Sequence, residues 1–291
     1  MNSPRLSIII PTYNRQDLLA KAVESALAQT IEDFEVIVVD DASPQPVNLP
    51  KHPRLQVIRL PENKGPSTAR NMGVKAANGR WVTFLDDDDR LLPHTAQVVL
   101  DALENTTLPQ PVALLSALEV INDKGEVKKV RIPPTLPKGC HFGLEEIEPN
   151  QSFFCKQSMV VEKEVLLSIG GFDELFTCRE TTELFLRLNQ VCSIQGIPTV
   201  TYQFIQHQTR RISHDTSRRQ ANVNRLLKKH QSLFKAHPKM FASFIYDHAI
   251  KLCDSGQIFE GIKNLLKAVL IHPTYTLVRI VSSVKNNVIR L

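Results

Sequence analysis

Four consecutive carboxylates, Asp86 to Asp89, are the residues whose types and spacing point most directly to chemistry. They come directly after the apolar stretch Trp81–Leu85. Two ionised carboxylates about 4 Å apart repel by roughly 1 kcal/mol in water and by roughly 4 kcal/mol at an effective dielectric constant near 20. Four such groups at the end of a core strand are therefore costly unless positive charge lies beside them.

Two further groups of polar residues also stand at the ends of predicted strands. PTYN (11–14) follows the strand predicted at 6–10, and DDAS (40–43) closes the strand predicted at 34–40. The carboxyl ends of parallel strands meet at one edge of a sheet, and open α/β sheets bind their ligands there. The three polar groups are therefore expected to converge on one edge.

Strands and helices alternate through the first hundred residues, which predicts a mainly parallel sheet with helices on both faces. Apolar spacing and cap residues predict strands at 6–10, 34–40, 54–60 and 81–86, and helices at 14–30, 66–78 and from Pro93 to about Glu104. The later pattern predicts a strand at 112–122, a long loop at 123–143 with room for a hairpin, a strand and a short helix within 153–174, a helix at 180–190 and a closing strand at 199–207.

The last part of the chain, from about residue 215, is predicted to be wholly helical and is strongly basic. Residues 201–291 hold 15 Lys and Arg against 4 Asp and Glu, whereas residues 1–200 hold 20 against 26, and the net charge is +5. A basic unit of this kind favours anionic partners such as lipid headgroups, phosphorylated substrates or nucleic acid. Few aromatic residues are interleaved with its cations to stack bases, so nucleic acid is not expected as a partner.

Two apolar stripes run along the predicted helices of this basic region. The first lies within 257–271, is expected to pack on the body of the protein rather than on a membrane, and comprises Ile258, Phe259, Ile262, Leu265, Leu266, Val269 and Leu270. The second lies within 274–291 and comprises Leu277, Ile280, Val281, Val284 and Val288, flanked by Arg279, Lys285 and Arg290. For this last helix, packing and peripheral membrane contact both stay open.

Composition favours a soluble protein of the cytoplasm. Hydrophobic residues make up 42% and charged residues 22% of the 291 positions, as in ordinary globular domains. Neither a membrane span nor a signal peptide is expected, because the apolar runs are short and no small-residue cleavage site follows the first of them. The five cysteines are widely spaced and form no CxxC pair, which argues against disulfides or a zinc site and favours a reducing compartment.

From residue 5 to about 210 the chain resembles the family 2 glycosyltransferases, nucleotide-diphospho-sugar enzymes of the GT-A fold. The segments that carry the resemblance stand in the family's order: SIIIPTYNR, LLAKAVESALAQT, FEVIVVDDAS, NKGPSTARNMGVKAANGRWVTFLDDDD, GGFDE and ETTELFLRL. The resemblance implies an α/β fold with a Rossmann-like, mainly parallel sheet flanked by helices. It implies a catalytic domain at 1–210, with a nucleotide-sugar half at about 1–110 and an acceptor half at about 111–210, followed by a basic amphipathic helical extension at 211–291.

By this resemblance Asp86 and Asp88 form a DxD motif that binds Mg²⁺ or Mn²⁺, with Asp88 as the more direct ligand. Both ions favour oxygen ligands, and an ion there would stabilise the charge that develops on a departing diphosphate. Asp87 and Asp89 either bind the ribose or donor sugar or cap the following helix. His207 matches a position that is often polar beside the diphosphate or metal, although a lone His is usually structural.

Further donor-binding residues follow from the same resemblance. Pro11, Tyr13 and Asp41 match positions that hold the nucleoside, with Asp41 as the acceptor for a base N–H. Asp40 matches a ribose-binding position. Arg70 resembles an arginine beside the diphosphate, whose oxygens a guanidinium can bind with two hydrogen bonds. Simple packing for Tyr13 and an ordinary surface charge for Arg70 stay open as alternatives.

One position on the acceptor side departs from the family pattern. Inverting transfer needs a carboxylate that takes the proton of the acceptor hydroxyl as its oxygen attacks C1. The family's Asp stands six residues before an Arg on the same helix, and counting back from Arg187 gives Thr181. Glu180 is therefore the expected base. Glu183 is a second option, although its carboxylate is better explained as a solvated helix charge.

The resemblance implies an inverting, hexosyltransferase-type enzyme whose donor is a nucleotide-diphospho-sugar, with a UDP-sugar favoured. The acceptor would be a hydroxyl of a glycan or lipid-linked molecule in surface polysaccharide or glycolipid synthesis. Peripheral contact of residues 274–291 with the cytoplasmic face of a membrane would bring the enzyme to a lipid-linked acceptor. The alternative is a nucleotide-sugar-binding protein with impaired catalysis, because Thr181 replaces the expected Asp.

Overall fold

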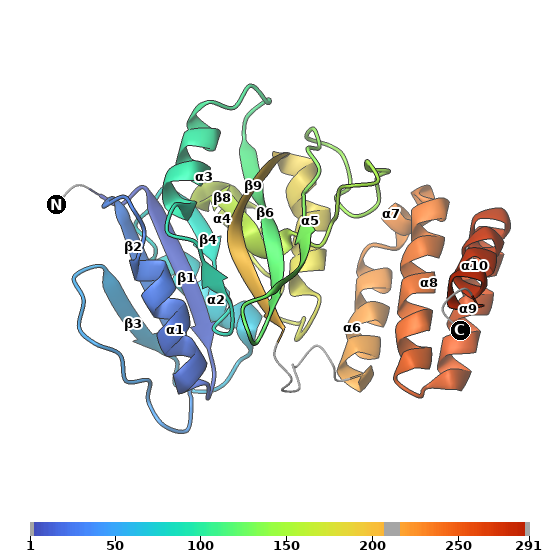
Figure 1. Cartoon of the computed structure of the whole chain (residues 1–291), viewed down its shortest axis with the longest axis horizontal. Helices are drawn as coiled ribbons and strands as arrows, with labels where there is room; N and C mark the ends of the chain where they lie inside the picture. The colour runs from blue at the N-terminus through green and yellow to red at the C-terminus, as the bar shows by residue number, and fades with distance from the viewer. Residues whose placement is uncertain (1–2, 207–215, 289–291) are drawn as a thin grey trace. The chain divides into compact units, whose positions relative to one another are not determined.

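The computed structural model describes residues 3–206 and 216–288 (Figure 1), with side chains omitted at 216, 217 and 283–288. The chain divides into two compact units. The sheet unit comprises residues 1–142 and 146–210, and the helical unit comprises residues 143–145 and 211–291. Each unit is described below by itself.

The first half of the sheet unit is parallel. Its strands are β1 (Leu6–Thr12), β2 (Phe34–Asp40), β3 (Leu55–Arg59) and β4 (Trp81–Phe84). The order β3-β2-β1-β4 places the first strand between the second and the fourth. Thr12 lies opposite Asp40 at the ends of β1 and β2, so the polar groups that follow these strands emerge at the same edge, as predicted.

The second half of the sheet is mixed. Its strands are β5 (Arg90–Leu91), β6 (Val112–Asn122), β7 (Val127–Arg131), β8 (Met159–Glu162) and β9 (Ser193–Gln206). β8 runs antiparallel between β4 and β6, and β9 runs parallel to β6 on the other side. β7 forms the hairpin partner of β6. β9 begins six residues before the predicted strand, because pairing with β6 extends it through Gly196 and Pro198, where the register shifts.

Helices cover both faces of this sheet, as predicted. They are α1 (Gln16–Leu27), α2 (Pro66–Ala76), α3 (Thr95–Glu104), α4 (Lys163–Ser168) and α5 (Glu180–Val191), with a short 3₁₀ turn at Lys156–Ser158. Successive strand residues point to opposite faces. Ile8 therefore packs with Leu19 of α1 on one face, and Ile9 packs with Ala69 of α2 and Leu184 of α5 on the other.

The helical unit contains α6 (Thr216–Lys229), α7 (Gln231–Ala236), α8 (Pro238–Asp254), α9 (Ile258–Ile271) and α10 (Pro273–Val288). Its small core includes Ile245 and Tyr246 of α8 and Ala268 of α9. None of the helices in the described part of the chain is long and apolar enough to cross a membrane.

Most of the apolar stripe of α9 does not pack inside the helical unit. The buried positions of α9 are Gly261, Asn264 and Ala268. A Cβ added at Gly261 would lie 2.3 Å from the Cys253 sulfur and 3.1 Å from the Ala249 carbonyl oxygen, so α9 approaches α8 through its smallest residues. The larger apolar side chains consequently face outward: Ile258, Phe259, Ile262, Leu266 and Leu270.

Candidate functional site

The four carboxylates after β4 lie together at the edge of the sheet. One oxygen from each of Asp86, Asp88 and Asp89 lies within 4.8 Å of the other two. Asp86 keeps 33% of its side chain exposed, whereas Asp87, Asp88 and Asp89 are buried. Because these carboxylates repel one another, positive charge is expected beside them. Two arginines from different elements of the fold provide it.

Arg15 pairs with the middle of the acidic cluster from the loop before α1. Its Nη1 donates to Asp87 Oδ1 at 3.0 Å and to Asp88 Oδ2 at 3.2 Å. The Thr12 hydroxyl donates to the other Asp87 oxygen at 2.7 Å. Burial raises the pKa of Asp87 to about 6, against the effect of Thr12 and Arg15. Sequence reasoning missed Arg15, although its position directly after PTYN, at the same sheet edge, could have indicated it.

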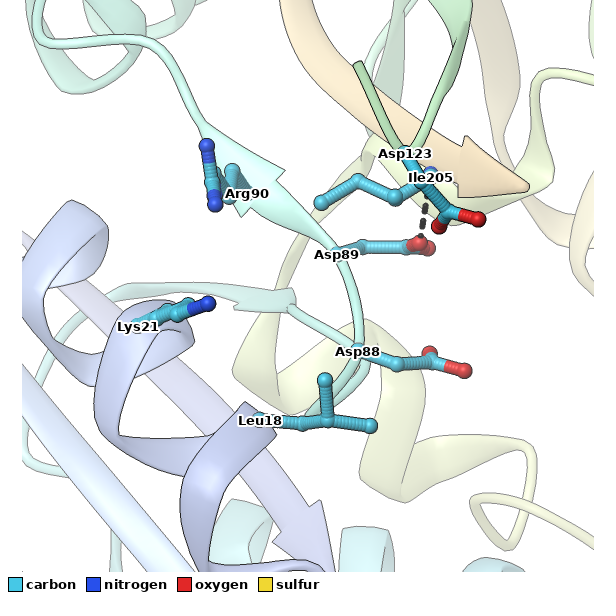
Figure 2. Close-up of a pocket in the computed structure, with 7 residues that line it drawn as sticks. All are labelled: Leu18, Lys21, Asp88, Asp89, Arg90, Asp123 and Ile205. Carbon is cyan, nitrogen blue, oxygen red and sulfur yellow. Dashed lines mark hydrogen bonds between the residues drawn. The ribbon is translucent and has the colours of Figure 1, made fainter. Parts of the chain in front are cut away.

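Asp89 anchors the acidic loop to β9. Its carboxylate accepts a hydrogen bond from the Tyr202 hydroxyl at 2.8 Å. It also accepts one from the Ile205 backbone N–H at 3.0 Å (Figure 2). Burial, with the nearby Asp89 and Asp86 charges, raises the pKa of Tyr202 well above its usual value, so the phenol keeps its proton. The predicted N-cap role of Asp89 is wrong, because the next helix, α3, begins at Thr95 and is preceded by His94.

Arg70 bridges the donor and acceptor halves of the predicted site. Its Nη2 donates to Asp86 Oδ1 at 2.7 Å, and its Nη1 donates to Glu180 Oε1 at 3.0 Å. The guanidinium also lies over the Phe172 ring, 5.5 Å from its centroid. Arg70 is buried, so the alternative of an ordinary surface charge is wrong. The structure therefore brings together three residues that lie far apart in the sequence.

The two glutamates at the start of α5 have different environments. Glu180, the first residue of the helix, pairs with Arg70. Glu183 is fully buried, and its two oxygens accept from Nε and Nη2 of Arg187 at 2.8 and 2.6 Å. Arg187 also donates to the Gly171 carbonyl oxygen. Glu183 is thus a buried structural carboxylate, and its interpretation as a solvated helix charge is wrong.

The predicted nucleoside-binding residues line the ends of β1 and β2. Tyr13 is 45% exposed, whereas Pro11 is buried. Asp41 accepts backbone N–H bonds from Lys64 at 2.8 Å and Gly65 at 2.7 Å, and burial raises its pKa despite these bonds.

Asp40 is fully buried at the end of β2. One of its oxygens accepts the Ser43 backbone N–H at 2.9 Å, and the other accepts from Arg59 Nη1. Arg59 also donates to the Ser43 carbonyl oxygen at 2.7 Å. Asp40 therefore fixes the loop that begins with Asp41.

A cavity of about 260 Å³ lies beside the acidic cluster. It is lined by Leu18, Lys21, Asp88, Asp89, Arg90, Asp123 and Ile205 (Figure 2). Lys21 and Arg90 lie on one side of it, and the carboxylates of the three Asp residues point to the other (Figure 2). Arg70 and Glu180 are not among its lining residues. His207, the remaining candidate from the sequence, lies outside the described residues.

The bridge formed by Arg70 predicts a large effect on stability. Arg70→Ala would leave Asp86 and Glu180 without their shared cation. Removing one partner of a buried ion pair typically costs about 3–5 kcal/mol, so we expect the free energy of unfolding in urea to fall by about 3 kcal/mol.

Arg80→Ala is the matched control for this variant. Arg80 pairs with Glu162 at 3.0 Å while 66% exposed, and exposed pairs contribute at most about 1 kcal/mol. Equal losses in the two variants would contradict the account of Arg70 as a buried bridge.

The chain is similar to known proteins over more than half of its length. Residues 7–166 match the model of glycosyl transferase family 2. An uncharacterized glycosyltransferase of Haemophilus influenzae is 30% identical over 187 residues, which cover 64% of this chain and 62% of that protein. The succinoglycan biosynthesis protein ExoO of Rhizobium meliloti is 44% identical over 94 residues, 31% of this chain and 27% of that protein. These matches span less than two thirds of each relative.

A solved structure shares the fold. Residues 1–349 of TarS from S. aureus, crystallised with UDP-GlcNAc, superpose with a TM-score of 0.53 at 18% identity. The superposition covers 85% of this chain and 81% of that one. At this identity the likeness shows the fold alone, and it agrees with the α/β sheet and helical region described above. The family match extends over more than half of the chain, from β1 to α4. The chain belongs to glycosyl transferase family 2.

Proposed function

We propose that the chain is an inverting transferase that moves a sugar from a nucleotide-diphospho-sugar to an acceptor hydroxyl. The observation that carries the proposal is the bridge from Asp86 through Arg70 to Glu180. It places a carboxylate of the acidic cluster and the candidate base on one buried guanidinium. A donor leaving group and an acceptor hydroxyl would meet at such a junction.

The residues of the acidic cluster fit a divalent metal of the Mg²⁺ or Mn²⁺ type. Three carboxylate oxygens lie within 4.8 Å of one another, and both ions prefer oxygen ligands. Because Asp89 holds β9 through Tyr202 and Ile205, Asp86 and Asp88 are the residues that would hold the ion. When bound, it would act as a Lewis acid on the diphosphate.

The β1 and β2 ends provide the proposed nucleoside site. The exposed ring of Tyr13 would stack on the base, next to the buried Pro11. Asp41 would accept a base N–H, because each carboxylate oxygen has a second lone pair beyond its bond to Lys64 or Gly65. Asp40 would act through the loop that it fixes rather than by direct contact with the ribose.

Two arginines and Asp87 complete the donor side. Arg70 and Arg15 would place positive charge beside the diphosphate, where guanidinium groups match phosphate oxygens. Asp87 would hold Arg15 in position. A UDP-sugar is favoured as the donor, because UDP-GlcNAc is the ligand of the TarS structure that shares this fold.

Glu180 is the proposed general base. Its carboxylate would take the proton of the acceptor hydroxyl while that oxygen forms a bond to C1 of the donor sugar. The C1–oxygen bond to the diphosphate breaks at the same time, and its electron pair leaves with the diphosphate. Both oxygens of Glu183 already accept from Arg187, which supports Glu180 in the role.

Synthesis of a surface polysaccharide or glycolipid is the proposed setting. It is supported by the name of the relative ExoO, a succinoglycan biosynthesis protein. The proposed acceptor is accordingly a glycan or lipid-linked hydroxyl.

Two observations favour a second candidate function. Glu180 is held in an ion pair with Arg70, and Thr181 stands where the family's Asp is expected. In that alternative the chain binds a nucleotide sugar without transferring the sugar. The two functions differ in donor hydrolysis: release of a nucleoside diphosphate that stops when the metal is chelated would support the transferase.

A thermal-shift screen of sugar nucleotides with Mn²⁺ tests donor binding directly. A ligand that binds only the folded state stabilises it by about 2.7 kcal/mol at a concentration of one hundred times Kd. We expect the unfolding temperature to rise with a UDP-sugar and Mn²⁺ together, and to rise less with either alone. No shift with any sugar nucleotide would contradict both candidate functions.

A further inference from the structure

Helices α9 and α10 of the helical unit carry many exposed apolar side chains. Among the side chains of these two helices that the structure describes, eight large apolar ones are exposed: Ile258, Phe259, Ile262, Leu266, Leu270, Leu277, Val278 and Val281. Phe259 is 79% and Leu270 is 84% exposed. Apolar surfaces of this kind on folded proteins mark sites that contact another molecule or a membrane.

The residues of α9 fall into three faces around the helix axis. At about 100° per residue, the buried residues Gly261, Asn264 and Ala268 occupy one side. The outward apolar residues, listed above for α9, occupy an arc of about 120° on the opposite side. Lys263 and Lys267 follow at the border of this arc, next to Leu270. This order, a packing face, an apolar face and a cationic border, is typical of a helix that lies in a membrane interface.

The cations at this border reach solvent. Lys263 is 68% exposed, with Glu260 at 3.5 Å, and Lys267 is exposed with its ammonium 5.8 Å from the centre of the Phe241 ring. Residues 201–291 carry 15 Lys and Arg against 4 Asp and Glu, one of which is the Glu260 beside Lys263. The surface is therefore complementary to negative charge.

An anionic lipid surface suits both properties better than a second copy of the chain. A second copy would bring its own excess of cations to the contact, and like charges facing each other oppose association. Anionic headgroups attract the lysines, and the acyl boundary accepts apolar side chains. The sequence points to residues 274–291 for membrane contact. Most of them lie on α10, whose described side chains end at Ser282. The most exposed apolar side chains of the two helices, Leu270 and Phe259, lie on α9.

We propose that the outward face of α9 binds anionic lipid headgroups. Phe259, Leu266 and Leu270 enter the boundary between headgroups and acyl chains, and Lys263 and Lys267 contact lipid phosphates. This surface lies within the helical unit alone, so the inference does not depend on the proposed transfer reaction.

Co-sedimentation of the full chain with vesicles tests this inference. The vesicles contain phosphatidylcholine alone, or phosphatidylcholine with an equal part of phosphatidylglycerol, over a series of salt concentrations. We expect binding to the anionic vesicles that weakens as salt rises. Lys263→Gln/Lys267→Gln should weaken this binding about thirtyfold, because each Lys near an anionic surface contributes about 1 kcal/mol.

A second variant tests the apolar face. Phe259→Ser/Leu266→Ser/Leu270→Ser should weaken vesicle binding at least about tenfold, also at high salt, because it removes apolar area rather than charge. The exposed hairpin of the sheet unit supplies matched controls: Lys124→Gln/Lys129→Gln for the charge change and Val127→Ser/Val130→Ser for the apolar change. Both should bind vesicles as the wild type does. Unchanged unfolding temperatures in all four variants would verify that each is folded.

Three results would overturn the inference. One is a wild-type chain that stays in the supernatant with anionic vesicles at low salt. Another is a serine variant that binds them as tightly as the wild type. The third is a dimer in analytical ultracentrifugation that the serine variant dissociates, without vesicle binding by the wild type. That result would assign the face to contact between two copies.

Discussion

Glu180→Gln is expected to lower the rate of sugar transfer at least about a hundredfold, the effect typical of losing a general base. The amide keeps the shape of the side chain and can still accept the hydrogen bond that Arg70 donates, but it cannot take a proton. Affinity for the nucleotide sugar should therefore stay close to that of the wild type. Steady-state transfer rates and calorimetric titration with the donor and Mn²⁺ measure the two quantities separately.

Glu164→Gln is the control for this change. Glu164 lies in the first turn of α4, as Glu180 lies in the first turn of α5, but Glu164 is exposed, whereas the Glu180 side chain is mostly buried against Arg70. It should transfer sugar at the wild-type rate. Turnover of the Glu180→Gln enzyme at the wild-type rate would remove Glu180 from the mechanism. A loss of donor affinity as large as the loss of rate would instead assign Glu180 a role in binding.

Asp88→Asn is expected to lower metal-dependent transfer by about 10²–10³-fold, the range for losing one stabiliser of transition-state charge. The change removes a charge from a cluster in which three carboxylate oxygens lie within 4.8 Å. The concentration of Mn²⁺ that gives half-maximal activity should rise. In the wild type, a chelator should abolish transfer, and added Mn²⁺ should restore it.

Asp101→Asn tests whether the loss of a negative charge elsewhere has the same effect. Asp101 is exposed on α3, where its carboxylate accepts from Gln97, and the substitution should leave the Mn²⁺ dependence unchanged. Full activity of the wild type in excess chelator would contradict the proposed metal, whatever the variants show.

The regular parts of the fold could be predicted because their apolar spacing is local. The strand predicted at 112–122 has the same bounds as β6, and Ile8, Ile9 and Ile10 alternate between the two sheet faces as a period of two requires. The start of β9 could not be predicted, because Gly196 and Pro198 are residue types that are depleted in strands. Pairing with β6 makes this segment a strand nonetheless.

The apolar pattern of α9 predicted a helix but not the direction of its faces. A stripe of large apolar residues normally packs inward, and here the close approach at Gly261 turns the stripe outward. Packing through small residues leaves a weak signal in a hydrophobic pattern, since Gly261, Asn264 and Ala268 include one polar residue and no large apolar one.

The candidate site was predictable as a set of residues, but its internal contacts were not. The convergence of residues 11–14, 40–43 and 86–89 follows from parallel strands ending at one edge. The bridge formed by Arg70 joins residues 16 and 110 positions away, and the sequence carries no local sign of such a pairing. The burial of Glu183 likewise depends on Arg187 and on the turn at Gly171.

The most direct test is a crystal structure of the chain with Mn²⁺ and a nucleoside diphosphate, recorded with the anomalous scattering of manganese. We predict one anomalous peak in contact with Asp88 and Asp86, next to the diphosphate, with the base against Tyr13. A nucleotide bound elsewhere, with Asp86 and Asp88 facing solvent and no manganese beside them, would contradict the account.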